Sequence, residues 1–529
     1  MKISVENLTL NVKGLPATID HELQRYIATR CGIKASDVLG YRILKRSIDA
    51  RHKPDLKLIY SLVATIKDGA EAVYPLVPAP AEMDNGTPNF ECKNGLLNPV
   101  VIGSGPAGLF CALILAQAGC RPVILERGKD VDSRHEDIDD FYSTRKLNEE
   151  SNFLFGEGGA GTWSDGKLYT RVRDGRIGYI LDTFIKFGAP REIGYFSHPH
   201  IGSDKLPLLI SAIRDEIIAL GGEFKWSTRA DTILVKGNVC KGVVLANGET
   251  LEAPAVVSAC GHSARKFILN LVNAGVKSSL KGFQVGCRIE HPQEFINQLR
   301  YGMRKAPPAL GSAEYSFASK PNANGSIAGA TTFCMCPGGE LIPATSDSGQ
   351  LCTNGMSNSD RDGFFANAAI VTAQDLSQFR TPAEAFAFLD MLEKKTFEAG
   401  GGDYTCPAQT AEDFMRGTAG ELPDDGSYGL GLRKFRVDSL LPEASKRAIR
   451  RAIKHIDNVV PGYIDNGVVV GLETRVSSPV RFDRDPETQE TSVANFYAIG
   501  EGAGMAGYAG GIMSSAVDGI RIAEAMLRK

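Results

Sequence analysis

A glycine-rich turn at residues 103–108, with the sequence GSGPAG, restricts the fold of this chain more than any other feature. The apolar run PVVI precedes the turn, and an apolar stretch with the composition of a buried helix follows over residues 109–118. A second apolar run at 122–125 leads directly into Glu126. A strand, a glycine turn, a helix, a second strand and an acidic residue in this order predict a βαβ unit that binds a dinucleotide. A glycine motif alone is weak evidence, but the complete order favours a Rossmann-type α/β domain.

Each of the three glycines of this turn has a physical role in the predicted unit. Gly103 permits a tight turn, Gly105 allows the backbone to approach a pyrophosphate, and Gly108 allows close packing of helix and strand. The phosphates are expected at the N-terminus of the helix, where free N–H groups and the helix dipole favour anions. The Glu126 carboxylate is expected to accept hydrogen bonds from ribose hydroxyls. The predicted cofactor contacts in this unit are Gly103, Gly105, Pro106, Ala107, Gly108 and Glu126.

Two further glycine-rich segments match the same spacing, at residues 156–161 and 502–507. Neither is followed by a strand that ends in an acidic residue, so neither predicts a second Rossmann unit. Residues 161–167 come within one residue of a P-loop, but Leu168 stands where a Mg²⁺-holding Ser or Thr is required. The sequence therefore argues against a nucleoside triphosphatase.

The C-terminal segment favours FAD over NAD. A predicted strand at 495–499 leads into GEGAG at 500–504, and a predicted helix begins near Gly511. FAD is long, so its ribitol and flavin need a second glycine-lined approach, where Glu501 can accept from ribitol hydroxyls and the helix N-terminus can face the flavin. The alternative interpretation is a structural turn with a helix cap. The predicted cofactor contacts in this segment are Gly500, Glu501, Gly502, Gly511 and Ile512.

The sequence does not predict a built-in nicotinamide domain. A disulfide reductase of the pyridine-nucleotide type would carry a second complete βαβ fingerprint and a redox-active C-x₄-C pair, and the sequence shows neither. NAD(P)H is therefore considered only as a diffusible electron donor.

Composition narrows the class of protein. The 529-residue chain carries 59 basic and 62 acidic residues, a net charge of −3, which provides no positive field for a dedicated nucleic-acid binder. No stretch reaches the roughly 18 uninterrupted apolar residues of a transmembrane helix, and the first residues lack a secretory signal. The 11 cysteines are odd in number and scattered, which is typical of a reduced protein. We therefore expect a cytoplasmic protein with a small-molecule substrate and without a membrane or nucleic-acid partner; the oligomeric state is left open.

Changes of pattern along the chain predict its domains. The first segment combines strand-like alternation with helical periodicity, and a stretch rich in Pro and Gly follows it. The predicted division is a small N-terminal α+β domain at 1–75, a linker at 76–97, the first part of the FAD-binding domain at 98–280, an inserted α+β substrate or lid domain at 281–462, and the C-terminal part of the FAD-binding domain at 463–529.

Five longer motifs carry more specific information. They are FGEGGAGTWSDGKL at 155–168, CMCPGG at 334–339, NGMSN at 354–358, GLETR at 471–475 and GEGAG at 500–504. Together they resemble the motifs of a bacterial family of uncharacterised FAD-dependent dehydrogenases, and the resemblance covers residues 98–529. The chain departs from that pattern at Trp163, where Phe is expected. The resemblance implies a glutathione-reductase-like FAD-binding domain, and it leaves the reaction open because the family is defined by its cofactor.

The resemblance also implies further cofactor contacts. Residues 156–167 would lie along the pyrophosphate and the flavin, and Arg127 would lie beside the adenosine. The backbone at Ala230 would hold the adenine, whereas Cys260 and Gly261 would return near the pyrophosphate. In the first of these segments the implied contacts are Gly158, Gly159, Gly161, Thr162, Ser164, Asp165, Gly166 and Lys167.

Three residues are candidates for the chemistry. Cys336 forms a C-x-C pair with Cys334, and the two thiols are interpreted as buried structural residues, as a redox or catalytic site, or as metal ligands. Zinc requires further Cys or His ligands at suitable spacing, so no metal is predicted. His291 is a candidate general acid or base, with a structural histidine as the alternative. Arg475 is a candidate for binding an anionic substrate or a flavin oxygen.

These features lead to one functional hypothesis and two alternatives. The hypothesis is an FAD-dependent oxidoreductase that acts on an unidentified small molecule by hydride transfer through the flavin. The first alternative is a reductase of isoprenoid double bonds, which requires an apolar tunnel in the inserted domain. The second is a flavin-bearing RNA-modification or RNA-binding protein with the N-terminal domain as its recognition module. The local basic patch that such a module would use consists of Lys45, Arg46, Arg51, His52 and Lys53.

Overall fold

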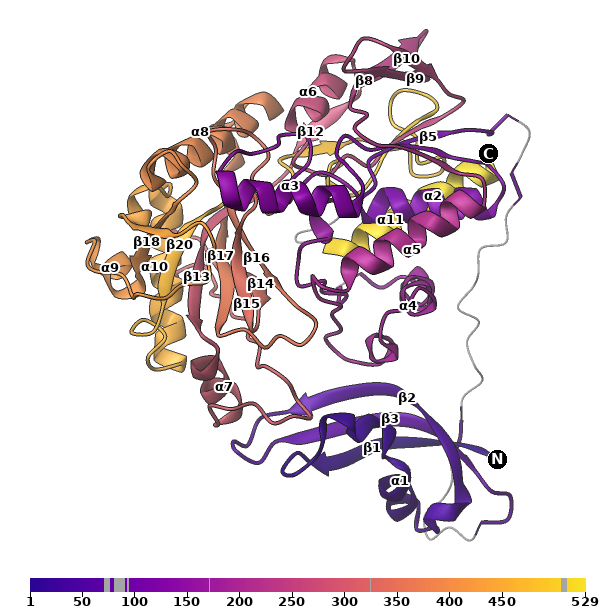
Figure 1. Cartoon of the computed structure of the whole chain (residues 1–529), viewed down its shortest axis with the longest axis vertical. Coiled ribbons are helices and arrows are strands. Elements are labelled where there is room, and N and C mark those ends of the chain that lie inside the picture. The colour runs from indigo at the N-terminus through magenta and orange to yellow at the C-terminus, as the bar shows by residue number, and fades with distance from the viewer. Residues whose placement is uncertain (71–76, 80–90, 93–94, 171, 324, 506–510) are drawn as a thin grey trace.

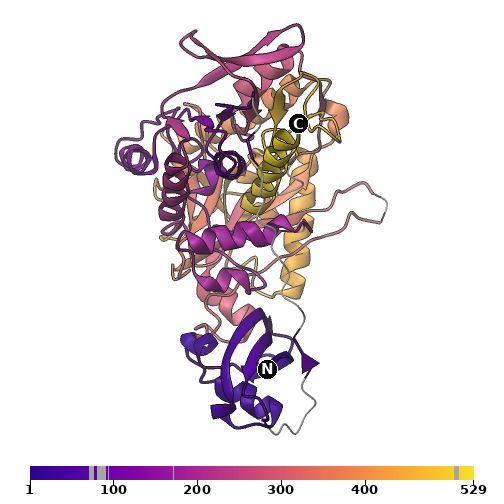
Figure 2. The same ribbon diagram turned by 90° about the vertical axis from the view of Figure 1, so that its right-hand side faces the viewer.

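The protein is a mixed α/β protein, as expected from the sequence. The predicted linker and the predicted end of the N-terminal domain lie largely outside the residues that the structure describes. Figure 1 shows the main body with the N-terminal module at one end of it, and Figure 2 shows the same division after a quarter turn. The computed structural model describes residues 1–529 except 71–76, 80–90, 93–94, 171, 324 and 506–510.

A five-stranded parallel sheet forms the centre of the FAD-binding domain, in the order β22-β11-β5-β6-β7. Its first three strands in the chain are β5 (Val100–Ile102), β6 (Val123–Leu125) and β7 (Glu223–Lys225), followed by β11 (Val256–Ser258) and β22 (Phe496–Ala498). Four of these strands are short, apolar and largely buried, as strands of a parallel sheet covered on both faces are, whereas the edge strand β7 is partly exposed. The predicted βαβ unit is present, because β5 pairs in parallel with β6 and the chain between them forms a helix.

Helices cover this sheet and explain its apolar sequence. Helix α2 is apolar on all sides because α11 and α5 pack against it (Figure 1). Glu126 follows directly after β6, where a ribose-binding acid was predicted. The helices of this domain are α2 (Pro106–Gln117), α3 (Val131–Thr144), α4 (Arg176–Lys186), α5 (Leu206–Ala219), α6 (Arg265–Asn273) and α11 (Gly511–Arg528).

Two smaller sheets complete the domain. A three-stranded antiparallel sheet in the order β10-β9-β8 lies at the top of the molecule in Figure 1, and a separate antiparallel pair joins β12 to β21. The strands are β8 (Ala230–Lys236), β9 (Val239–Leu245), β10 (Thr250–Glu252), β12 (Ser278–Leu280) and β21 (Val480–Phe482).

The inserted domain is built on a six-stranded sheet in the order β14-β17-β13-β20-β18-β19, and a β15–β16 hairpin and helix α10 pack on it. Its strands are β13 (Gln284–Pro292), β14 (Thr331–Cys336), β15 (Gly339–Pro343), β16 (Thr353–Ser357), β17 (Phe365–Ala373), β18 (Cys406–Thr410), β19 (Leu432–Lys434) and β20 (Val468–Glu473). Its helices are α7 (Gln293–Tyr301), α8 (Pro382–Gly400), α9 (Ala411–Arg416) and α10 (Glu443–Val459).

The position of β20 corrects one predicted boundary. Residues 463–529 were assigned to the C-terminal part of the FAD-binding domain, but β20 pairs antiparallel with β13 and β18 in the middle of the inserted sheet. The inserted domain therefore extends beyond residue 462. An apolar strand carries no local signal of which sheet it joins.

The N-terminal module is an antiparallel sheet in the order β2-β3-β1-β4 with one helix. A buried polar cluster joins it to the main body: the Asp20 carboxylate pairs with Arg46 at 2.8 Å and accepts from the Tyr195 hydroxyl at 3.1 Å. The elements of this module are β1 (Lys2–Asn11), α1 (Gln24–Cys31), β2 (Val38–Asp49), β3 (Lys57–Ile66) and β4 (Val77–Pro78).

Among the helices that the structure describes, none combines the length and the apolar character needed to cross a lipid bilayer.

Candidate functional site

A cavity of about 750 Å³ lies along the glycine loops and continues against the inserted domain. This volume falls in the range of sites that enclose cofactors. Most of the predicted cofactor-binding residues line it. They are Gly103, Gly105, Pro106, Ala107, Glu126, Arg127, Gly159, Gly161, Ser164, Asp165, Gly166, Lys167, Ala230, Cys260, Gly261, Gly500, Glu501, Gly511 and Ile512.

Four predicted contacts do not line the cavity. A side chain at Gly108 would overlap the carbonyl oxygen of Gly103, and one at Gly502 would lie 2.8 Å from the carbonyl oxygen of Gly261. Gly158 has a φ of 77°, and a side chain there would overlap the hydroxyl of Thr162. That hydroxyl donates to a backbone carbonyl at 2.8 Å. The assignment of Gly108, Gly158, Thr162 and Gly502 as direct contacts is therefore corrected: they shape the loops that carry the contacts.

Gly105 provides a test of whether the site fits FAD. It precedes α2 with φ −69° and ψ 179°, a conformation open to any residue. A Cβ added at this position would meet only the Cα of Gly159, at 4.0 Å. The protein itself therefore does not require glycine here. The free space lies in the cavity at the N-terminus of α2, where a pyrophosphate gains backbone N–H donors and the helix dipole.

Glu126 holds three loops around this end of the cavity. One carboxylate oxygen accepts from the backbone N–H and hydroxyl of Ser104, at 3.0 and 2.7 Å. The other accepts from the backbone N–H groups of Gly128 and Gly156, at 3.0 and 3.1 Å. A carboxylate has about four lone-pair sites. The four protein donors therefore fill the acceptor sites of Glu126, which anchors the loops in this structure, and a ribose hydroxyl would have to share or displace one of these donors.

The second glycine loop is held from behind by Arg134, a residue that the sequence did not single out. This side chain of α3 is fully buried and donates to the backbone carbonyls of Asn152, Glu157 and Gly159, at 2.8, 2.6 and 2.9 Å. A buried guanidinium that bonds three carbonyls fixes a loop that has no regular hydrogen-bond ladder of its own. No local pattern marks such a residue, because its partners lie on a distant segment.

A buried charge cluster follows at the end of this loop. Asp165 accepts a bidentate pair from Arg361, at 2.9 and 2.6 Å, and Lys167 Nζ lies 2.8 Å from Oδ2, the oxygen that also accepts from Arg361 Nη2. Burial by itself would raise the pKa of Asp165, but the two cations outweigh burial and hold that pKa below its ordinary value. Lys167 lines the cavity, so this cluster places a fixed cation on the wall.

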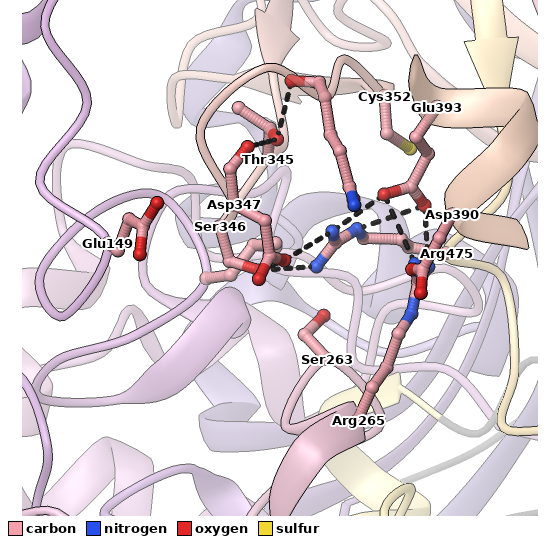
Figure 3. Close-up of polar contacts among 12 residues, drawn as sticks. Glu149, Ser263, Arg265, Thr345, Ser346, Asp347, Cys352, Asp390, Glu393 and Arg475 are labelled. Carbon is pink, nitrogen blue, oxygen red and sulfur yellow. Dashed lines mark hydrogen bonds and ion pairs between the residues drawn. The ribbon is translucent and has the colours of Figure 1, made fainter. Parts of the chain in front are cut away.

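Arg475 also lines the cavity, but its charge is already paired. It lies 2.7 Å from Glu393 and 3.2 Å from Asp347, and Arg265 approaches Glu393 from the other side (Figure 3). Burial raises the pKa of Glu393, whereas the two guanidinium groups lower it more, to about 2. An anion that binds Arg475 must therefore compete with a buried carboxylate. Sequence reasoning found Arg475 but missed Glu393, which lies on a distant helix.

His291 lies in the core of the inserted domain, not on the cavity wall. Its ring is 1% exposed, packs against Tyr463 at 4.2 Å between ring centroids, and bonds the Tyr463 carbonyl oxygen through Nε2 at 2.9 Å. Burial lowers the pKa of His291 to about 4, so it is neutral near pH 7. The predicted acid–base role is therefore replaced by the alternative, a structural histidine.

Cys336 is likewise buried behind the wall, and of the C-x-C pair Cys334 is the thiol that lines the cavity. The assignment of Cys336 as a direct catalytic contact is corrected in favour of its neighbour. The reason is a bulge in β14, which breaks the alternation that would place both side chains on one face.

The fold and the cavity define an FAD-binding flavoprotein, and comparisons with known proteins agree. A family model described as FAD-dependent protein, C-terminal domain-like, matches residues 282–476, and a domain of unknown function matches residues 3–65. The first match ends just after β20, in agreement with the corrected boundary. An uncharacterized protein of Clostridium beijerinckii is 36% identical over 542 residues, covering 99% of each chain. The chain belongs to the same family as this protein, and its cofactor is FAD.

Similarity to solved structures is weak. Glycine oxidase from Geobacillus kaustophilus gives a TM-score of 0.36 at 11% identity, over 82% of this chain and 95% of that one. The halogenase PltM, as a point mutant in complex with FAD, gives a TM-score of 0.40 at 9% identity, over 82% of this chain and 70% of the halogenase chain. Glycerol-3-phosphate dehydrogenase from Bacillus halodurans, complexed with FAD, gives a TM-score of 0.36 at 11% identity, over 82% of this chain and 64% of the dehydrogenase chain. These scores are too low to support an argument about mechanism.

Proposed function

We propose that this protein is an FAD-dependent oxidoreductase that acts on a small molecule. One observation carries the proposal: the cavity that begins at the first glycine loop continues to side chains of the inserted domain. Phe333, Cys334 and Asn354 line it together with Gly105. A cofactor seated on the glycine loops therefore shares one enclosed space with a second set of functional groups, which is the arrangement of a cofactor beside a substrate.

The residues that would hold FAD have separable tasks. Gly105 and the N-terminus of α2 would bind the pyrophosphate. The N-terminus of α11, at Gly511 and Ile512, and the Lys167 cation favour negative charge at the cavity wall. Bound FAD supplies a ring system that accepts or donates two electrons as a hydride equivalent. Phe333 and Ile512 present apolar surface to the same space and exclude water from it.

The lining of the inserted domain supports a polar substrate over an isoprenoid. This domain presents Asp347, Gln350, Asn354, Asp390 and Arg475 to the cavity. Several of these groups have partners within the protein, but an apolar isoprenoid chain would remove water from all of them, at a cost of about 1–3 kcal/mol for each group left with an unmet hydrogen bond. The proposed substrate is therefore a small polar molecule, with NAD(P)H as a candidate diffusible donor.

The basic patch of the N-terminal module does not favour RNA. Arg46 is buried against Asp20, and Arg51 pairs with Asp49 at 2.7 Å. The Lys53 ammonium donates to the backbone carbonyl of Leu299 at 2.6 Å. Three of the five basic residues are thus engaged within the protein, which supports a role for the module other than phosphate binding.

Anaerobic flavin reduction tests the proposal. The purified holoprotein is mixed with NADH, NADPH and a panel of polar metabolites, and bleaching of the flavin absorbance is followed. We expect at least one donor to bleach the flavin and a suitable acceptor to restore it. Flavin that responds to dithionite but to none of these donors would contradict an oxidoreductase of polar small molecules.

A further inference from the structure

The strand that carries the C-x-C pair is distorted at its first cysteine. In the β14–β17 pairing, Phe333 faces Ala369 and Cys336 faces Asn367, so β14 takes three residue steps where β17 takes two. Cys334 occupies the extra position with a φ of 44°, a left-handed conformation that non-glycine residues seldom adopt. As a result the Cys334 side chain lines the cavity, whereas Cys336 is fully buried behind it.

A buried cation holds this distortion in place. Arg288 Nη1 donates to the Cys334 carbonyl oxygen at 2.8 Å and to Asn367 Oδ1 at 3.0 Å. The guanidinium is itself fully buried and pairs with Glu473. Strained backbone persists only where its surroundings fix it, and such sites concentrate where function requires a particular side-chain position. The structure therefore fixes one thiol at the cavity wall.

The two thiols interact and have unequal surroundings. The Cys336 thiol donates to the Cys334 carbonyl oxygen at 3.3 Å, and Lys167 Nζ lies 4.0 Å from the Cys336 sulfur. A hydrogen bond from Cys336, together with the Lys167 and Arg288 cations, lowers the pKa of Cys334, whereas the same thiol–thiol contact and burial raise the pKa of Cys336. One accessible, acidic thiol beside one buried thiol is the arrangement of an attacking and a resolving cysteine.

A metal site explains the pair less well. In the part of the chain that the structure describes, no cluster of three or more His, Cys, Asp or Glu side chains is arranged to hold a metal ion. The Lys167 ammonium, 4.0 Å from the Cys336 sulfur, would also repel a cation.

We propose that Cys334 and Cys336 form a dithiol/disulfide couple that exchanges two electrons with the FAD of the same cavity. In the oxidising direction two S–H bonds break and one S–S bond forms, and the two electrons and two protons released convert FAD to FADH₂. In the other direction FADH₂ returns them and the disulfide opens. The exchange with flavin rests on the proposed function, but formation of the disulfide does not.

The first experiment needs no variant and no flavin. Protein is oxidised with diamide, the excess is removed, and thiols are counted in denaturant before peptides are mapped by mass spectrometry. We expect the thiol count to fall by two from 11, with the loss of two hydrogens assigned to the peptide that contains Cys334 and Cys336. A full thiol count, or a disulfide between other cysteines, would overturn the couple.

The second experiment counts electrons in the holoprotein. Diamide-oxidised protein is titrated with dithionite without oxygen until the flavin is fully reduced, and the electrons taken up by that point are counted. The wild type should take up four electrons per FAD, twice the uptake of Cys334→Ser, Cys336→Ser and Cys336→Ala. Cys240→Ala, which removes a buried thiol in the three-stranded sheet, should keep the full uptake. Uptake of two electrons by wild type whose disulfide has been mapped would refute exchange with the flavin, whereas protein that binds no FAD refutes the proposed function alone.

Discussion

Replacing Gly105 with alanine separates the needs of the fold from those of the cofactor. The backbone there, with φ −69° and ψ 179°, accepts alanine, and the added methyl would lie 4.0 Å from its nearest neighbour, the Cα of Gly159. The free energy of unfolding of the flavin-free protein should change by less than about 1 kcal/mol, since alanine caps a helix slightly worse than glycine but restricts the unfolded chain.

The same methyl enters the space assigned to the pyrophosphate. Overpacking of a close contact costs about 1–3 kcal/mol, which corresponds to about 5- to 150-fold weaker FAD binding. Isothermal titration calorimetry of the flavin-free protein measures this change, and urea unfolding measures stability. Gly105→Trp should abolish FAD uptake.

Two glycines provide matched controls. Gly175 precedes α4 with φ −61°, and a side chain there meets nothing within 4 Å. Gly175→Ala should therefore change neither the FAD affinity nor the free energy of unfolding. Gly108→Ala should destabilise the protein by about 2–3 kcal/mol, because its methyl would overlap the Gly103 carbonyl oxygen. Unchanged FAD affinity in Gly105→Ala, or an equal loss in Gly175→Ala, would refute the assignment of this loop to the pyrophosphate.

Three further predictions concern charged and titratable groups. Glu393→Gln should lower the free energy of unfolding by about 3–5 kcal/mol in urea, because Arg265 and Arg475 lose their shared buried carboxylate. In the folded wild type the pKa of Glu393 is about 2, below the value of about 4.3 in the unfolded chain. The stabilisation by Glu393 is therefore complete above pH 4.3 and is lost as the pH falls towards 2. A difference in unfolding free energy between variant and wild type that stays constant over this range would contradict the pairing. Lys167→Gln should make the two-electron midpoint potential of the flavin more negative, by about 30 mV for each 1.4 kcal/mol of lost attraction between the cation and the reduced flavin. A dye-coupled titration measures this potential, and an unchanged value would place the cation away from the flavin. His291→Asn should leave the pH dependence of flavin reduction between pH 6 and 8 unchanged, since His291 is neutral there, and a lost ionisation in this range would restore the acid–base role.

The parts of the fold that the sequence predicted depend on neighbours in the chain. The turn at 103–108, the helix after it and Glu126 form one continuous βαβ unit, so their order alone specifies the geometry. The helix predicted to begin near Gly511 is likewise a local feature, and α11 begins at that residue. The residues between 506 and 510 lie outside the described part of the chain.

The features that the sequence did not reveal depend on pairing over long distances. The bulge that moves Cys334 to the cavity wall is defined only by the register of β14 against β17. The two-residue period of a regular strand would instead place Cys334 and Cys336 on the same face. Glu393 joins an arginine of α6 to one that follows β20, and no local pattern brings these residues together. His291 has a suitable chemical type, but only the packing of Tyr463 shows that it is enclosed.

The most direct measurement of the central claim is the flavin content of the purified protein. The protein is reconstituted with FAD, freed of excess cofactor, denatured, and the released flavin is identified by chromatography and quantified against protein. We expect FAD in a ratio close to one per chain, and a large loss of that ratio in Gly105→Trp at unchanged folding. Protein that remains colourless after reconstitution, or that retains FAD equally in Gly105→Trp, would contradict this expectation.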